Sequence, residues 1–428
     1  MHKDFKPIAA TLKKANAAVA RAYPGETGDR QPVHTVYGGA QLFTADLAPK
    51  LGARALQTLD QHAPTAQAFA EALGLVGHRD RALATTIRDR VVAKLRREPV
   101  EDFRIDFEDG YGNRLDQEED GHAEAAAEEV AKGLEAGTLP PFIGIRIKPL
   151  STELHARSLR TLDVFVSTLV GKTRRRLPPN FVVTVPKLMT PAHVSAVASA
   201  CRVLERRLRL EKGSLRLELM IETPQSILAP DGASALRALV AAGGGRVRGA
   251  HFGTYDYTAL CGITASWQHM RHQACDFARH MMQIALAQSG LWLSDGATNV
   301  LPVPPDVHRA WRTHFDDVQH SLVNGYYQGW DLHPAQLPSR YAAVYAFFLS
   351  ALPAATTRLR NFVEKAAQAT LVGDVFDDAA TGQGLLNFFV RGLNSGALTL
   401  EEAAATGLTP EELRGRSFLN ILEARKQR

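Results

Sequence analysis

RLELMIETPQS (Arg216–Ser226) and GAHFGTYDYTALCG (Gly249–Gly262) are the two stretches of sequence that decide the fold. Each contains a short apolar run typical of a buried strand, and an acidic residue follows it: Glu222 in the first stretch, Asp256 in the second. Carboxylates at the ends of consecutive strands can hold Mg²⁺ or Mn²⁺ and leave coordination positions open for a substrate. Taken alone, each carboxylate could equally cap a helix or end a strand.

The same alternation of short apolar runs and longer helical segments continues along the chain. Eight runs are predicted to be strands: residues 33–40, 103–110, 142–149, 181–188, 215–222, 247–254, 291–296 and 326–334. The segments between them carry apolar residues at helical spacing. Strand–helix alternation predicts right-handed parallel units, and eight units predict an α/β fold of the TIM (β/α)₈ barrel type. No GxGxxG follows the first strand, which argues against a dinucleotide-binding open sheet.

The barrel is predicted to carry three additions. Residues 1–30 are expected to form an N-terminal helical segment that is basic and amphipathic. A long helical insertion follows the first strand at residues 46–100. The catalytic barrel domain spans residues 31–352, closed by a helix at 340–352, and residues 353–428 form a C-terminal helical extension. We expect that extension to serve as a lid or as an oligomer arm.

Composition and charge argue against several classes of protein. The net charge is +5, and the basic residues concentrate at 171–180 and 201–218. We interpret them as solvated helix faces, because no aromatic stacking platform or zinc finger accompanies them, and expect no nucleic-acid partner. No segment is expected to be long and charge-free enough to span a membrane. Three cysteines without metal-site spacing are typical of a reduced, cytoplasmic protein.

Polar side chains stand at the ends of most predicted strands. In a barrel of this type the carboxyl ends of the strands open into one mouth, where active sites lie. The residues at these ends are Asp106, Glu108, Asp109, Arg146, Lys148, Lys187, Glu222, Asp256, Ser294, Asp295, Asp331 and His333. We therefore expect them to converge on one site. His333 is expected to order a loop through hydrogen bonds rather than to act as a base.

The cations at the strand ends each allow two interpretations. Arg146 and Lys148 share one face of their strand because side chains alternate. The planar guanidinium of Arg146 can grip a substrate carboxylate, or it can pair with Glu108 or Asp109. Lys187 can balance charge or form a Schiff base with a carbonyl substrate. We favour charge balance, since a metal site makes the covalent route redundant.

Six motifs occur in a characteristic order: DFEDG (106–110), IRIK (145–148), VPK (185–187), ET (222–223), FGTYD (252–256) and HPAQ (333–336). This ordered set resembles the citrate lyase β-subunit-like (HpcH/HpaI aldolase) family of the pyruvate/phosphoenolpyruvate-binding barrel superfamily. The resemblance covers roughly residues 33–348. It implies a Mg²⁺-dependent carbon–carbon lyase or aldolase that cleaves or forms a 3-hydroxy acid, free or as a CoA thioester, through the enolate of a 2-oxo acid.

The resemblance also implies roles for individual residues. Glu222 and Asp256 would be metal ligands for Mg²⁺, with Mn²⁺ as an alternative. The residues implied in catalysis are Arg146, Glu108, Asp109 and Asp377, and those implied in substrate binding are Arg146, Lys148, Lys187, Gly253 and Thr254. Asp377 and its neighbour Asp378 lie in VFDDAATGQ, which resembles a segment that supplies a base in family members. A helix N-cap explains either aspartate equally well.

The chain departs from the family pattern in three ways. Asp109 occupies the place at which class II aldolases have a histidine, so the base of that branch is missing. The insertion and the tail exceed those of a minimal lyase, and no separate motif indicates coenzyme A binding. Two alternatives therefore stay open: a malate synthase-like condensing enzyme, and a non-catalytic metabolite-binding barrel subunit, since fold does not fix function. By resemblance we expect a homo-oligomer, either a trimer or a hexamer.

Overall fold

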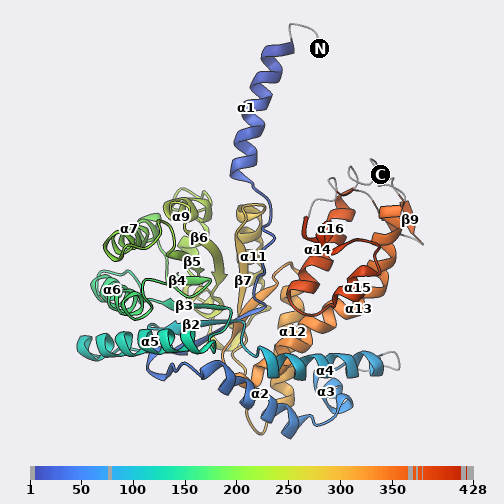
Figure 1. Ribbon diagram of the computed structural model, residues 1–428, viewed down its shortest axis with the longest axis horizontal. Coiled ribbons are helices and arrows are strands. Elements are labelled where there is room, and N and C mark those ends of the chain that lie inside the picture. The colour runs from blue at the N-terminus through green and yellow to red at the C-terminus, as the bar shows by residue number, and fades with distance from the viewer. Residues whose placement is uncertain are drawn as a thin grey trace.

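The computed structural model describes residues 5–75, 80–364, 370–372, 375–377, 379–415 and 421. Eight parallel strands close into a barrel in sequence order, and the last strand pairs with the first (Figure 1). They are β1 (His34–Gly39), β2 (Asp102–Asp106), β3 (Phe142–Arg146), β4 (Phe181–Val185), β5 (Arg216–Ile221), β6 (Val247–Phe252), β7 (Trp292–Ala297) and β8 (Gln328–Asp331). None extends more than one residue beyond its predicted range. The predicted (β/α)₈ barrel is therefore confirmed.

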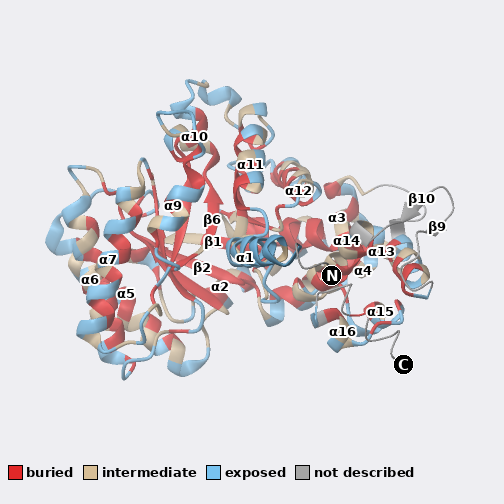
Figure 2. Ribbon diagram, turned by 90° about the horizontal axis from the view of Figure 1, so that it is seen from above, coloured by how far each residue is buried: buried red, intermediate tan, exposed pale blue. Residues whose placement is uncertain are grey.

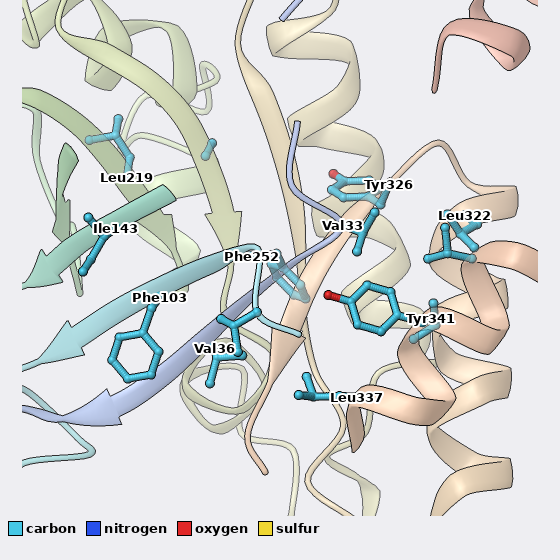
Figure 3. Close-up of a cluster of buried hydrophobic side chains, with 14 of the residues drawn as sticks. Val33, Val36, Phe103, Ile143, Leu219, Phe252, Leu322, Tyr326, Leu337 and Tyr341 are labelled. Atoms are coloured by element: carbon cyan, nitrogen blue, oxygen red, sulfur yellow. The ribbon is translucent and has the colours of Figure 1, made fainter. Parts of the chain in front are cut away.

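Helices surround the barrel and cover the outward faces of the strands, most of which are apolar. The outer layer consists of α5 (Asp116–Ala136), α6 (His155–Lys172), α7 (Pro191–Leu208), α9 (Leu236–Ala242), α11 (Gln273–Leu286), α12 (Val307–Val323) and α13 (Leu337–Glu364). Local sequence sets their ends: α5 stops at Gly137, whose φ of 67° is the left-handed conformation that glycine adopts at little cost. Figure 3 shows Val33, Leu322 and Tyr341 in one buried apolar cluster between the barrel and α13.

Short helical turns occupy the loops that follow the strands. They are η2 (Ala40–Leu42), α8 (Pro224–Ile227), α10 (Thr254–Leu260), η3 (Ala265–Trp267) and η4 (Pro334–Gln336). The insertion after β1 forms α2 (Leu47–His62), α3 (Ala66–Leu73) and α4 (Asp80–Arg97), so the helical insertion was predicted correctly. At the N-terminal end the predicted helix is present as α1 (Lys6–Ala22), which stands away from the barrel in Figure 1.

The C-terminal region differs from the prediction in two respects. The closing helix was expected to end at residue 352, but α13 continues through Pro353 to Glu364, where buried side chains such as Leu359 and Phe362 keep it packed. The extension was expected to be helical throughout, yet β9 (Thr370–Val372) and β10 (Val375–Asp377) form an antiparallel pair. Three helices follow: α14 (Ala379–Asn394), α15 (Leu400–Ala404) and α16 (Pro410–Gly415).

The segment Pro334–Glu364 is long and apolar enough to cross a membrane by length and composition. The expectation that no segment meets this test was wrong. Half of its most apolar window is buried inside the protein, and α13 packs against α12 and α4. Core packing therefore accounts for the apolar composition of this helix.

The barrel interior beneath the mouth is polar, which was not predicted. The Arg104 guanidinium donates to Thr184 Oγ1 at 2.9 Å, and it pairs with Asp102 and Glu218. All four side chains are buried. Polar residues at 102, 104 and 106 alternate with apolar ones in DFRID, so the signal for an inward-facing polar row was present in the sequence.

Candidate active site

The end of β5 places Glu222 in the barrel mouth against its two neighbouring strands. Glu222 Oε1 accepts a hydrogen bond of 2.6 Å from the backbone N–H of Lys187, which follows β4. On the other side, Gly253 follows β6, and a Cβ built on it would lie 2.5 Å from Cβ of Glu222 and 2.7 Å from its Oε2. Only glycine leaves room for this carboxylate. The Gly253 of FGTYD thus shapes the site by making space.

Asp106 and Arg146 form the floor of the mouth at the ends of β2 and β3. Arg146 Nε donates to Asp106 Oδ1 at 2.7 Å, and Arg146 Nη2 donates to Oδ2 of the same carboxylate. Backbone N–H groups of Glu108 and Gly110 also donate to Asp106. The Arg146 guanidinium lies over the ring of Tyr37, 4.8 Å from its centroid. Asp106, rather than Glu108 or Asp109, is therefore the bidentate partner of Arg146.

Glu108 lies between the two cations of the mouth. Its Oε2 is 2.8 Å from Arg146 Nη1, and its Oε1 accepts a hydrogen bond of 2.5 Å from Lys187 Nζ. Lys187 Nζ also contacts Asp109 Oδ2 at 3.3 Å and Asp256 Oδ2 at 3.2 Å. A single ammonium group thus bridges three carboxylates. This geometry agrees with the charge-balancing interpretation of Lys187.

Crowded carboxylates shift the pKa values in the mouth. Burial and the neighbouring charge of Glu108 raise the pKa of Glu222 to about 8. Burial also raises the pKa of Glu108, in spite of the charges of Arg146 and Lys187. Burial would lower the pKa of Lys187, but the charges of Glu222 and Glu108 outweigh it and raise the pKa. The geometry also gathers four carboxyl groups around the single ammonium group of Lys187, namely those of Glu108, Asp109, Glu222 and Asp256, and this excess of acidic groups favours an added cation.

A cavity of about 690 Å³ opens above these groups. Glu108, Asp109, Lys187 and Asp256 line one part of it. A second part is apolar and is formed by Pro149, Leu154, Met189, Ala259 and Leu260. Another cavity, of about 280 Å³, lies at the opposite end of the barrel beside α14, far from the carboxylates. Four of the charged groups of the mouth therefore line the first cavity, and Glu222 and Arg146 contact two of them, Lys187 and Glu108, without lining it.

The acidic residues of the mouth fit a hard divalent cation. Glu222 and Asp256 come from separate elements and contribute to each other's environment, since the charge of Asp256 helps to raise the pKa of Glu222. Glu108 Oε2 is buried and accepts no hydrogen bond, although it lies within ion-pair distance of Arg146 Nη1. No set of three or more His, Cys, Asp or Glu side chains is placed to hold a metal among the described residues. A pair of carboxylates still suits Mg²⁺, which commonly keeps several water or substrate ligands.

Other residues expected in substrate binding lie around the mouth. Lys148 lines the cavity, but its Nζ donates to the backbone carbonyls of Phe107 (2.7 Å) and Gly112 (3.0 Å). Thr254 is buried, and its hydroxyl donates to Met270 Sδ at 3.0 Å. Lys148 therefore orders the loop after β2, and Thr254 supports the loop after β6 from below.

The polar residues of the last two strands do not converge on the mouth, so that expectation was wrong. Asp295 binds Arg279 of α11 and Ser321 of α12, both of which lie in the helical layer. Asp331 likewise accepts hydrogen bonds from His34 Nδ1 at 2.7 Å and Arg340 Nε at 3.0 Å. The alternation of side chains along a strand points these carboxylates outward.

Two further polar residues of these strands have local roles. Ser294 is buried in β7, where its hydroxyl donates to the Asp295 carbonyl. His333 caps η4: its Nδ1 accepts from the backbone N–H of Ala335 at 3.1 Å. The loop-ordering role predicted for His333 is therefore confirmed.

The two C-terminal aspartates can be described only through the backbone of Asp377. The backbone of Asp377 lies in β10, opposite Thr370 of β9. The prediction had placed it in a helical segment, so that part of the prediction was wrong. Asp378 lies outside the described residues. A catalytic role for Asp377 stays a prediction.

Sequence comparison places the chain in a family. The family model described as Domain of unknown function (DUF6986) matches residues 12–421. The chain belongs to the DUF6986 family. A comparison with curated proteins gives no match.

Solved structures extend the comparison of this DUF6986 protein to its fold. A citrate lyase from Burkholderia xenovorans LB400 superposes with a TM-score of 0.59 at 17% identity, over 88% of this chain and 97% of that chain. A malate synthase from Haloferax volcanii, at 3 mM glyoxylate, gives a TM-score of 0.49 at 14% identity, over 90% of this chain and 96% of that one. The resemblance predicted to citrate lyase β-subunit-like proteins is supported at the level of the fold.

Proposed function

We propose that this protein is a Mg²⁺-dependent carbon–carbon lyase or aldolase that acts on a 3-hydroxy acid and releases or consumes a 2-oxo acid. The observation that carries the proposal is the gathering of Glu222, Asp256 and Glu108 in one barrel mouth, with Arg146 beneath them. Glu222 and Asp256 would hold the metal, with Mn²⁺ as an alternative to Mg²⁺. As the carbon–carbon bond breaks, its electron pair would pass to the 2-oxo-acid fragment, and the hydroxyl-bearing carbon would leave as an aldehyde or ketone; a divalent cation at this position would stabilise the negative charge on the 2-oxo-acid fragment.

The protein side chains would divide the remaining work. Glu108 lines the cavity and has a raised pKa, so its carboxylate is suited to accept the hydroxyl proton of the substrate. Arg146 holds Glu108 in place through Nη1 and is itself fixed by Asp106. Lys187 stays protonated and neutralises charge rather than acting as a nucleophile, because its pKa is raised.

The walls of the cavity favour a free acid over a CoA thioester. A thioester would require cations to bind the phosphates of the nucleotide. The lysines that line this cavity are Lys148 and Lys187, and both are engaged by protein oxygens. The apolar wall instead offers contact area to an alkyl or aryl chain. We therefore place a free 2-oxo or 3-hydroxy acid with an apolar chain as the substrate class.

Calorimetric titration of the metal-stripped protein tests the proposal. Mg²⁺ is added with pyruvate, glyoxylate or oxaloacetate to the wild type, to Glu222→Ala and to Asp256→Ala. The exposed residue Glu211 provides the matched control, Glu211→Ala. Metal-dependent binding that both site variants lose and the control keeps supports the site. Equal binding in all four proteins, or none in the wild type, would refute it.

Turnover then separates the alternatives. A lyase releases a 2-oxo acid from a 3-hydroxy acid without consuming a thioester, whereas a malate synthase-like enzyme would release free CoA from acetyl-CoA in the presence of glyoxylate. A non-catalytic subunit would bind the acid with metal and turn over neither mixture.

A further inference from the structure

Helix α1 (Lys6–Ala22) has no buried residue along its whole length. Figure 1 shows it standing away from the barrel, and Figure 2, which views it end-on, shows its surface as exposed. The side chains of Ile8, Leu12 and Val19 are 55%, 56% and 56% exposed. Most of the stability of a helix in a protein comes from packing of its apolar face against another element. We therefore expect the apolar side chains of α1 to pack against another element.

The large apolar residues of α1 form one stripe together with two alanines. Ile8, Leu12, Ala15, Val19 and Ala22 follow one another at alternating intervals of four and three residues. This interval is that of the a and d positions of a heptad repeat, in which Leu12 and Val19 occupy a, and the other three occupy d. Such a stripe is typical of a helix that pairs with another helix.

Charge distribution distinguishes a second helix from other partners. The cations of α1 are Lys6, Lys13, Lys14 and Arg21, and all fall at the b and c positions, away from the stripe. Small or neutral residues flank the stripe at e and g: Ala9, Thr11, Asn16 and Ala18. Two copies can therefore bring their stripes together without opposing like charges. A helix lying on a membrane carries a charged face opposite large apolar side chains that enter the lipid. In α1 the large apolar residues are only Ile8, Leu12 and Val19, and the rest of the apolar face is alanine, which contributes little to lipid insertion but allows a second helix to approach closely.

The base of α1 is fixed to the body of the protein. The guanidinium of Arg237, in α9, lies over the ring of Tyr23, 4.7 Å from its centroid. Two residues later, the backbone N–H of Gly25 donates to the carbonyl of Gln288 at 2.9 Å. The helix therefore leaves the barrel from an anchored point and presents its stripe beyond it.

We propose that α1 pairs with α1 of a second copy of this chain in a two-helix coiled coil through the stripe Ile8, Leu12, Ala15, Val19 and Ala22. This pairing is independent of the chemistry in the barrel mouth. It joins two protomers at the end of α1 and leaves both mouths outside the contact.

The experiment measures the mass of the full chain in solution by light scattering after gel filtration. Leu12→Glu and, separately, Val19→Glu place a carboxylate in the stripe. Ala17→Glu places the same side chain at the f position, on the far side of the helix, and is the matched control. Thermal melts by circular dichroism check the barrel, which should keep the wild-type melting temperature in all variants because these positions are exposed.

The pairing requires that both stripe variants have half the mass of the wild type and that Ala17→Glu keeps the full mass. A wild type that runs at the 46.7 kDa of one chain overturns the proposal. So does an unchanged mass in both stripe variants, or an equal loss in the control. Binding of the wild type to anionic vesicles that Leu12→Glu abolishes, with no change in mass, would assign the stripe to a membrane surface and equally overturn the pairing.

Discussion

Lys187 holds Glu222 through its backbone while its own side chain turns toward other carboxylates. The backbone N–H donates to Glu222 Oε1 at 2.6 Å, and Nζ lies 2.5 Å from Glu108 Oε1 and 3.2 Å from Asp256 Oδ2. Lys187 adopts a φ of +47°, in the left-handed region that non-glycine residues rarely occupy. Such a conformation costs on the order of 1–3 kcal/mol and is typical of functional sites. The strained turn after β4 thus arranges the acidic residues of the mouth.

The raised pKa of Glu222 predicts a pH dependence of stability. A carboxyl group whose pKa is about 8 in the folded protein, against 4.5 ordinarily, binds its proton more tightly in the folded state than in the unfolded state. Stability must therefore fall as the pH rises from about 4.5 to about 8. We expect metal-stripped wild type to lose on the order of 2–4 kcal/mol across that range relative to Glu222→Gln, since one pKa unit is worth about 1.4 kcal/mol.

Urea unfolding at half-unit pH steps measures this difference. Saturating Mg²⁺ should remove the fall in the wild type, because the cation stabilises the ionised carboxylate. Parallel pH profiles for wild type and Glu222→Gln, without metal, would contradict the shifted pKa.

Arg146 should be sensitive to replacement by lysine. Arg146→Lys keeps the positive charge but cannot bind both oxygens of Asp106 and reach Glu108 at once. We expect a loss of stability of about 2–4 kcal/mol, as for a damaged buried ion pair. 2-Oxo-acid binding should weaken at least tenfold, because Glu108 loses its support, while Mg²⁺ binding persists. Titration calorimetry measures the dissociation constants of the 2-oxo acid and of Mg²⁺. The control is Arg207→Lys, which changes an exposed ion pair with Asp163. If Arg146→Lys bound the 2-oxo acid as tightly as the wild type, the proposed support of Glu108 by Arg146 would be contradicted.

Lys187 should fail to form a Schiff base. Its pKa is raised by Glu222 and Glu108, so the amine stays protonated and lacks the lone pair that attacks a carbonyl. Incubation with pyruvate and sodium borohydride should add no mass to the intact chain, and Lys187→Met should give the same spectrum. A reduced adduct present in the wild type and lost in Lys187→Met would identify a covalent enzyme and overturn the charge-balancing role.

The barrel could be predicted because its signal is periodic and repeated. Most strands have an apolar outward face, such as Ile143 and Ile145 in β3, and helical segments of ordinary length separate the strands. A pattern that recurs eight times tolerates errors of one residue at each end. The end of α13 was mispredicted because a proline such as Pro353 usually breaks a helix. Buried side chains on both sides of Pro353 stabilise α13, and the helix continues past it.

The site could be predicted only in part. Strand order brings Glu222, Asp256 and Lys187 together, because consecutive parallel strands end at the same mouth. The predicted pairing of Arg146 with Glu108 is present, but its bidentate partner Asp106 was missed, since both carboxylates face inward and the sequence does not show which one the guanidinium binds through two hydrogen bonds. Asp331 was misplaced because the last strand turns it toward Arg340 of α13.

The apolar wall of the cavity predicts a preference for chain length. Leu260 is 59% exposed in the absence of substrate and lines the cavity together with Met189 and Leu154. Each methylene of a 2-oxo acid that reaches this wall should tighten binding about fourfold, since burying one methylene contributes about 0.8 kcal/mol. Titration of pyruvate, 2-oxobutyrate, 2-oxopentanoate and 2-oxohexanoate in the presence of Mg²⁺ measures this dependence of affinity on chain length.

Leu260→Asp should abolish the increase in affinity with chain length and leave the affinity for pyruvate unchanged. Leu301→Asp changes an exposed leucine outside this wall and should keep the increase. A flat series in the wild type, or competition by acetyl-CoA at micromolar concentration, would contradict the free-acid site and favour a thioester.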